Sequence, residues 1–116
     1  MKPDLREKQG VAILEPPGQL TVGGGDQVLR DAVDTLLGTG RTKILLNLSR
    51  LQSMDSAGVG ELVASFRMVE RFGGKLKILN APSKVKKSLS LAKLLPIFEI
   101  FDDEDEAIAS FATSDN

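Results

Sequence analysis

Residues 44–66, ILLNLSRLQSMDSAGVGELVASF, contain the change in pattern that decides the fold. The nearly continuous apolar run at residues 43–48 is typical of a strand buried on both faces, as in parallel sheets covered by helices. The loop sequence MDSAGVG follows, in which Ser56 comes directly after Asp55 and before two glycines. Beyond it the apolar residues have helical spacing, which predicts an amphipathic helix that begins close to Ser56: Val59, Leu62, Val63, Phe66 and Val69.

The alternation of strand and helix patterns continues towards the N-terminus. Residues 11–14 are a short apolar run followed by a Pro-Pro-Gly turn, and residues 5–9 are a candidate edge strand that pairs with it. Residues 26–37 have helical spacing, and Asp26 is a candidate N-cap for that helix.

Towards the C-terminus the pattern predicts strands at residues 76–79 and 97–101. A third helix at residues 82–92 has Pro82 in its first turn and Val85, Leu89 and Ala92 on its inner face. A last helix begins in the acidic segment 102–106. We therefore predict an α/β fold: one domain over residues 1–116, with a mixed, mostly parallel sheet of four or five strands, about four helices and a frayed tail at residues 113–116.

The composition narrows the possible functions. The 116 residues carry a formal net charge of −1 and include no His and no Cys, which excludes Ser-His-Asp and Cys-His catalysis and the usual zinc sites. No apolar run approaches the roughly 20 residues that span a bilayer, and the N-terminus lacks a signal-peptide pattern. We expect a cytoplasmic protein that is not an enzyme, holds no metal or cofactor, and neither binds nucleic acid nor inserts into membranes.

Ser56 permits two interpretations at this junction. In the first, Asp55 or Ser56 is simply the N-cap of the helix. In the second, Ser56 is a phosphoacceptor, because free N–H groups and the helix dipole tolerate a phosphate whose charge would repel a partner. Gly58 and Gly60 likewise either let a partner's backbone approach or suit the start of the helix. Ser53 is a nearby alternative phosphoacceptor.

The segment 44–66 resembles the signature of STAS domains, the anti-sigma-factor antagonist family, in which Asp-Ser-Ser/Ala-Gly-Leu/Val-Gly joins an apolar strand to an amphipathic helix. The resemblance covers nearly the whole chain, including GDQVLRDAVDTLL at residues 25–37 and LAKLLPIFEIFDDEDEAI at residues 91–108. It implies that a partner serine kinase, which is also the anti-sigma factor, phosphorylates Ser56. Unphosphorylated antagonist binds that kinase and frees the sigma factor, which regulates transcription, and a phosphatase resets the cycle.

The resemblance also implies a partner-binding surface. One position departs from the family pattern, because many members carry Gly-x-Leu-Asp where this chain has Gly-Gln-Leu-Thr, and Asp26 is a candidate substitute for the missing carboxylate. This departure leaves an alternative open, a constitutive STAS scaffold subunit of a signalling or transporter complex without a phosphorylation switch. The expected surface residues are Met54, Asp55, Ser56, Ala57, Gly58, Gly60, Thr21 and Asp26.

Other charged or glycine-rich segments favour structural roles. The triple glycine at residues 23–25 lacks the ending of a phosphate-binding loop and is interpreted as a flexible turn. The lysines between residues 84 and 93 are interpreted as a solvated helix face, since no aromatic residues are interleaved with them. The acidic segment 102–106 does not have EF-hand spacing and suits the first turn of a helix.

Overall fold

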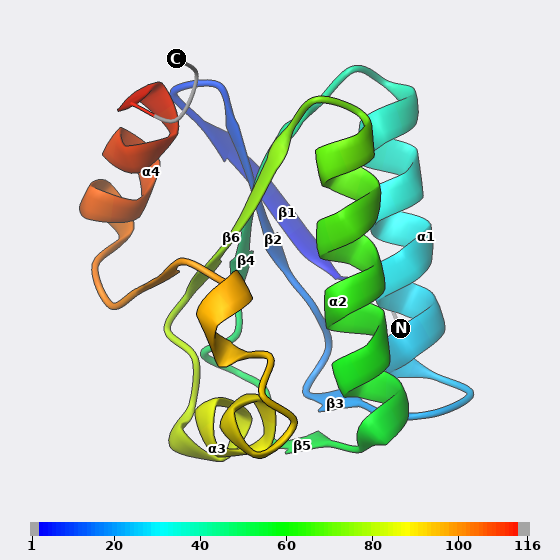
Figure 1. Cartoon of the computed structure of the whole chain (residues 1–116). Helices are drawn as coiled ribbons and strands as arrows, with labels where there is room; N and C mark the ends of the chain where they lie inside the picture. Colours follow the sequence, from blue (N-terminus) through cyan, green and yellow to red (C-terminus); the bar gives the residue numbers. More distant parts are fainter. Residues whose placement is uncertain (1–2, 114–116) are drawn as a thin grey trace.

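The computed structural model describes residues 3–113, with side chains for residues 3–112. Figure 1 shows a layered α/β arrangement in which helices lie on both faces of a central sheet. The strands are β1 (Asp4–Lys8), β2 (Val11–Glu15), β3 (Gln19–Leu20), β4 (Lys43–Asn47), β5 (Ser53–Met54), β6 (Lys75–Leu79) and β7 (Ile100–Phe101). The helices are α1 (Gly25–Gly38), α2 (Ser56–Arg71), α3 (Ser83–Leu91) and α4 (Glu104–Thr113), together with the 3₁₀ helix η1 (Leu95–Ile97).

The main sheet has five strands in the order β1-β2-β4-β6-β7. Only β1 is antiparallel to its neighbour, and the remaining pairs are parallel. The prediction of a mixed, mostly parallel sheet with four helices is therefore confirmed. A second, two-stranded sheet pairs β3 with β5 in parallel and brings the segment before α1 next to the segment before α2.

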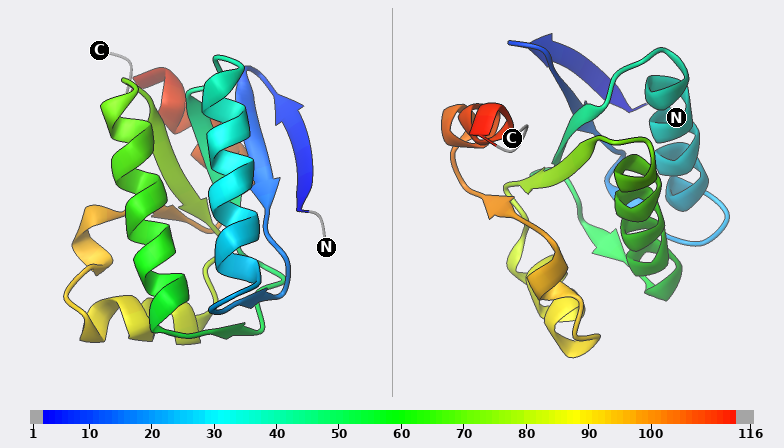
Figure 2. Two further views of the ribbon diagram at one scale, coloured as in Figure 1. Left: turned by 90° about the vertical axis from the view of Figure 1, so that its right-hand side faces the viewer. Right: turned by 45° about the horizontal axis from the view of Figure 1, so that its top comes forward.

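Two apolar layers hold the helices on the sheet. Helices α1 and α2 cover one face side by side, while α4 lies on the other face (Figures 1 and 2). Strand β4 contributes to both layers, because Ile44 and Leu46 belong to the cluster under α1 and α2, whereas Leu45 packs with Phe111 of α4. This alternation explains the continuous apolar run of β4, since successive side chains of a strand point to opposite faces.

Several boundaries differ from the expectations. Asp26 is not the N-cap of α1, because the helix begins at Gly25 and Gly24 occupies the capping position. The earlier start depends on a close approach: a Cβ on Gly25 would lie 1.7 Å from the carbonyl oxygen of Gln19 in β3. Local spacing cannot reveal this contact, because the approach depends on where β3 lies.

The C-terminal half also contains corrections. Pro82 directly precedes α3 instead of lying in its first turn, and Ala92 is exposed at the end of that helix. The strand expected at residues 97–101 is limited to Ile100–Phe101, because η1 occupies Leu95–Ile97. The expected frayed tail lies outside the described residues, apart from Thr113, whose backbone ends α4. No helix in the described range is long and apolar enough to cross a membrane.

Candidate functional site

The N-terminus of α2 carries the serine that the sequence singled out. Ser56 is the first residue of the helix, and its side chain is exposed. Asp55 is the N-cap, and its Oδ1 atom accepts a hydrogen bond from the N–H of Gly58 at 3.0 Å. Of the two capping candidates, the structure therefore selects Asp55, which leaves the hydroxyl of Ser56 outside the cap.

Asp55 also connects α2 to the loop between β3 and α1. Its Oδ2 atom accepts a hydrogen bond from the N–H of Val22 at 3.0 Å, and its own N–H donates to the carbonyl of Leu20 at 3.4 Å. The N–H groups of Val22 and Gly58 hold the pKa of the Asp55 carboxyl below its usual range, because they stabilise the ionised form. The loop is thereby fastened to the N-terminus of α2 by a charged hydrogen-bond acceptor.

The two glycines of the motif have different environments. Gly58 is buried, and a Cβ built on it would lie 2.0 Å from the carbonyl oxygen of Leu20 and 2.8 Å from Cγ of Met54. Gly60 is exposed, and no heavy atom lies within 4 Å of the position of its absent Cβ. Gly58 thus makes room for this chain's own β3 strand, whereas Gly60 lies open on the surface of α2.

Helix α3 completes the surface around Ser56. A hollow of 410 Å³ is lined on one side by Met54, Asp55, Ser56 and Val59 and on the other by Ser88, Leu91 and Ala92 of α3. Figure 1 shows α3 beside β5 at the start of α2. The side chain of Leu91 is 77% exposed, and that of Val22, held next to Asp55, is 72% exposed. We call Val22, Asp55, Ser56, Ser88 and Leu91 the Ser56 surface.

The remaining residues predicted for partner binding lie around this surface. Ala57, in the first turn of α2, is half-buried. Thr21 and Asp26 lie on either side of the loop that contains Val22, and the N–H of Asp26 donates to the carbonyl of Thr21 at 3.3 Å. The Asp26 carboxylate accepts hydrogen bonds from the N–H groups of Gly24 and Gln27. It therefore serves to order its own loop.

Sequence reasoning missed two contributions to this region. The first is α3, whose apolar spacing predicted core contacts and gave no indication that Ser88 and Leu91 face Ser56. The second is a buried polar group in α2: Glu61 is 5% exposed, accepts a hydrogen bond from the Ser65 hydroxyl at 3.1 Å and pairs with Arg30 of α1 at 2.9 Å. Glu61 directly precedes the apolar Leu62 and Val63, a position that gave no signal of burial. Within the described residues no group of three His, Cys, Asp or Glu side chains is arranged to hold a metal ion.

Comparison with known proteins places this geometry in a family. The family model for the STAS domain matches residues 2–107. The anti-sigma F factor antagonist of Paenibacillus polymyxa is 26% identical over 105 residues, which cover 90% of each chain. The crystal structure of a Thermotoga maritima protein, provisionally named an anti-sigma factor antagonist, superimposes with a TM-score of 0.83 at 28% identity and covers 94% of this chain and 93% of that one.

A third similar protein has been solved in a modified state. The phosphorylated form of the Bacillus cell fate determinant SpoIIAA has a TM-score of 0.72 and 26% identity, with 93% of this chain and 97% of that chain covered. The likeness extends over nearly the full length of each of these proteins. From the match of the family model and the arrangement of strand, Asp-Ser motif and helix, the chain belongs to the STAS domain family, as the motif at residues 54–60 had indicated.

Proposed function

We propose that this protein is an anti-sigma factor antagonist whose binding to its partner is controlled by phosphorylation of Ser56. The partner in this proposal is an anti-sigma factor with serine kinase activity, and its capture frees a sigma factor and so regulates transcription. The observation that carries the proposal is the exposed Ser56 at the first position of α2, directly after a capping aspartate. Similarity to the Paenibacillus antagonist and to a phosphorylated Bacillus protein supports it.

The position of Ser56 suits a modification that changes binding without changing the fold. The first N–H groups of a helix lack intrahelical acceptors, and the helix dipole places partial positive charge there. A phosphate on Ser56 is therefore compatible with α2, and it adds about 1.5 to 2 negative charges next to Asp55. A partner surface fitted to the neutral hydroxyl and one carboxylate would meet a concentrated negative charge, and like-charge contact at an interface costs several kcal/mol.

The apolar side chains around Ser56 supply the attractive part of the interface. Val22, whose N–H donates to Asp55, and Leu91, which lines the hollow with Ser56, each expose most of their surface. Apolar side chains that a partner covers are the usual source of binding energy, whereas a charged group buried with them must lose its hydration. A phosphate on Ser56 would therefore weaken binding, because it would have to lose its hydration when the partner covers these apolar side chains.

In this proposal the chain is the substrate of the kinase and is not itself an enzyme. Among the described residues that line the hollow, Asp55 is the one with a titratable side chain, and both of its carboxylate oxygens accept backbone N–H groups. An attacking serine needs a general base within hydrogen-bonding reach, and an oxygen already used in this way is a poor one. A separate serine phosphatase would restore the hydroxyl, and the cytoplasm is the proposed location of the cycle.

Binding measurements on three variants test the proposal. With the anti-sigma factor kinase encoded in the same genome as the ligand, Ser56→Ala should bind constitutively in the presence of ATP. Ser56→Asp should bind at least tenfold more weakly, which corresponds to about 1.4 kcal/mol. Ser53→Asp is the matched control, because Ser53 lies in β5 three residues before Ser56, and it should bind like the wild type.

Mass spectrometry then locates the phosphate. The tryptic peptide at residues 51–67 contains Ser53, Ser56 and Ser65, so fragment ions must distinguish these sites. Phosphate on Ser56 after incubation with kinase and ATP supports the switch. A stable complex that forms equally well with Ser56→Asp and does not respond to ATP would reject it in favour of a constitutive scaffold.

A further inference from the structure

We propose that the free edge of β1 is a self-association surface at which two copies of this chain pair antiparallel about Leu5. Strand β1 lies at one end of the sheet order, and β2 is its neighbour on the inner side. Figure 2 shows β1 at the periphery of the molecule, away from α2 and α3. This proposal is independent of the switch at Ser56, which lies at the start of α2.

The hairpin between β1 and β2 determines which backbone groups are free. Gln9 and Gly10 form its two-residue turn with φ values of 53° and 81°, the conformation of a type I′ turn. Lys8 and Val11 close this turn as directly opposed partners. In such a hairpin the closing pair exchanges both hydrogen bonds, and every second residue along β1 then does the same. The N–H and C=O groups of Leu5 and Glu7 are the ones that point away from β2.

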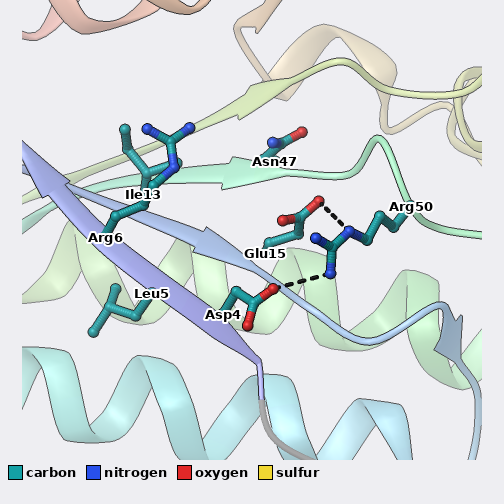
Figure 3. A pocket seen from close by; sticks show the side chains of 7 residues that line it. All are labelled: Asp4, Leu5, Arg6, Ile13, Glu15, Asn47 and Arg50. Carbon is teal, nitrogen blue, oxygen red and sulfur yellow. Dashed lines mark hydrogen bonds and ion pairs between the residues drawn. The ribbon is translucent and has the colours of Figure 1, made fainter.

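The side chains of β1 also separate into two faces. Figure 3 shows Leu5 on the side of the strand that faces α1, and Arg6 on the opposite side. Leu5 is 51% exposed and lines an apolar hollow of 540 Å³ with Leu14 of β2 and Val28 and Ala32 of α1. The edge therefore combines backbone groups that point away from β2 with an exposed apolar side chain over a partly open apolar surface.

Charge and apolar complementarity together favour a second copy as the partner and the register about Leu5. Hydrogen bonds to a second strand can form through Leu5 and Glu7, whose backbone groups point outward. The two-fold axis of an antiparallel pair must therefore pass through Leu5, through Glu7, or through Arg6 between them. An axis at Arg6 sets Asp4 against Lys8 of the other copy, but it places the two arginines opposite each other at the centre and the apolar Leu5 opposite the Glu7 carboxylate. An axis at Glu7 places two glutamates opposite each other and Arg6 opposite Lys8. An axis at Leu5 instead brings the two leucines together and places Asp4 of each copy opposite Arg6 of the other.

The charged side chains remain available for this pairing. Arg6 pairs with Glu104 of α4 and Asp4 with Arg50, yet the Arg6 and Asp4 side chains are 54% and 64% exposed. Charged residues on an edge strand normally discourage pairing with other strands. Here the register about Leu5 sets Asp4 of each copy against Arg6 of the other, so these two charged pairs favour the association. The result is an isologous dimer with a joint sheet and both α1 helices on the same face.

We expect the dimer to be reversible, because pairing of one short strand from each copy gives a small interface. Chemical trapping therefore tests it best, and the absence of cysteine from the chain makes single cysteines specific. In the proposed register the two Leu5 Cα atoms are about 5.5 Å apart, as in any hydrogen-bonded antiparallel pair. The two Glu7 Cα atoms are offset by four residues and lie roughly 14 Å apart.

The first experiment treats Leu5→Cys and Glu7→Cys with a short bis-maleimide cross-linker. Leu5→Cys should give several-fold more covalent dimer than Glu7→Cys, and dilution should abolish the difference. Equal trapping of the two variants would overturn the register. If Leu5→Cys were cross-linked only to a different protein added from a cell extract, the inference that a second copy of this chain binds the edge would be overturned.

The second experiment exchanges charges and uses sedimentation equilibrium. Asp4→Arg and Arg6→Glu should each dimerise several-fold more weakly than wild type, because each places like charges in opposition. An equimolar mixture of the two should recover association, since every pair across the axis is then attractive. Circular dichroism checks the fold of Arg6→Glu, because this variant loses its ion pair with Glu104. The cross-linking experiment does not depend on this variant.

A third variant distinguishes failure of the dimer proposal from failure of the switch proposed for Ser56. Leu5→Lys should remain monomeric while Ser56 is phosphorylated and the partner bound as in the wild type. Loss of dimerisation with an intact switch supports the assignment of the edge. A wild type that is monomeric at every concentration up to about 1 mM would overturn the dimer without affecting the proposed function.

Discussion

At the N-terminus of α2, two glycines two positions apart perform different tasks. Gly58 allows the helix to approach β3 so closely that any side chain would overlap the Leu20 carbonyl, whereas Gly60 has open space around it. A glycine at a close approach is required by packing, and a glycine in an exposed helix only lowers helix stability. Packing against β3 thus requires a glycine at position 58, whereas no packing contact requires one at position 60.

This contrast gives a stability prediction. Gly58→Ala should lower the free energy of unfolding by about 2 to 3 kcal/mol, because the new methyl group displaces β3 or α2. Gly60→Ala should raise it by roughly 0.5 to 1 kcal/mol, because alanine favours the helix. Urea denaturation of both variants provides the measurement. Destabilisation of similar size in the two would contradict the packing role of Gly58.

Asp55 leads to a prediction about pH. Its pKa in the folded protein is lowered by the N–H groups of Val22 and Gly58, so the ionised carboxylate stabilises the fold. This contribution is complete above the pKa of the unfolded chain, about 3.9, and disappears as the pH falls through the lower folded value. The difference in unfolding free energy between the wild type and Asp55→Asn should be largest near neutral pH and shrink below about pH 4. A difference that stays constant from neutral to strongly acidic pH would show that the charge of Asp55 has no part in the cap.

At the scale of elements, α1 and α2 are joined by a polar contact as well as an apolar one. The Glu61 carboxylate is buried between them, while Arg30, its partner, is half exposed. Removing the partner of a buried charge costs more than neutralising the charge, because the charge remains without compensation. The pair therefore makes the spacing of the two helices sensitive to Arg30.

The corresponding prediction concerns which of two variants, Arg30→Met or Glu61→Gln, loses more stability. Arg30→Met should cost about 2 to 3 kcal/mol of stability, because within residues 3–112 the Ser65 hydroxyl is then the one side-chain donor left to Glu61. Glu61→Gln should cost about 1 kcal/mol, since the amide is neutral and can still accept a hydrogen bond. Thermal and urea unfolding of each single variant and of the double variant give the coupling energy. Glu61→Gln as the more damaging change would contradict this account.

At the scale of the whole molecule, the apolar core and the proposed partner-binding surface lie in different parts of the fold. The two apolar clusters lie on the two faces of the sheet, whereas Ser56 is exposed at the start of α2. A negative charge at the first helical position is stabilising by about 0.3 to 1 kcal/mol. The fold should therefore tolerate the proposed phosphorylation of Ser56.

We predict that Ser56→Asp leaves the free energy of unfolding unchanged or raises it within that range, while partner affinity falls. Ser56→Ala, which removes the hydroxyl without adding charge, is the matched control. Differential scanning calorimetry measures stability, and titration with the kinase measures affinity. A destabilised Ser56→Asp would mean that weaker binding reflects local unfolding and not charge at the interface.

Much of the architecture could be predicted from the residues alone. The apolar run of β4 indicated a central parallel strand, and the spacing after Ser56 indicated α2, because the period of apolar residues reports both the element and its buried face. The alternation of patterns along the chain then indicated an α/β fold. Helix ends were less accurate, as at Asp26 and Pro82, because the position of an end depends on neighbouring segments.

What the sequence determined by itself is therefore the set of elements, the mostly parallel sheet and the location of Ser56 at a helix N-terminus, since these follow from local periodicity and capping chemistry. Only the tertiary structure decided what surrounds that serine. It placed β3 against Gly58, the N–H of Val22 within hydrogen-bonding distance of the Asp55 carboxylate, and Ser88 and Leu91 opposite Ser56. It also buried Lys77 of β6 at 1% exposure, with its ammonium bonded to Ser110 of α4. The physical reason is the same for each: the contact joins segments far apart in the chain, and no local pattern encodes how two elements dock.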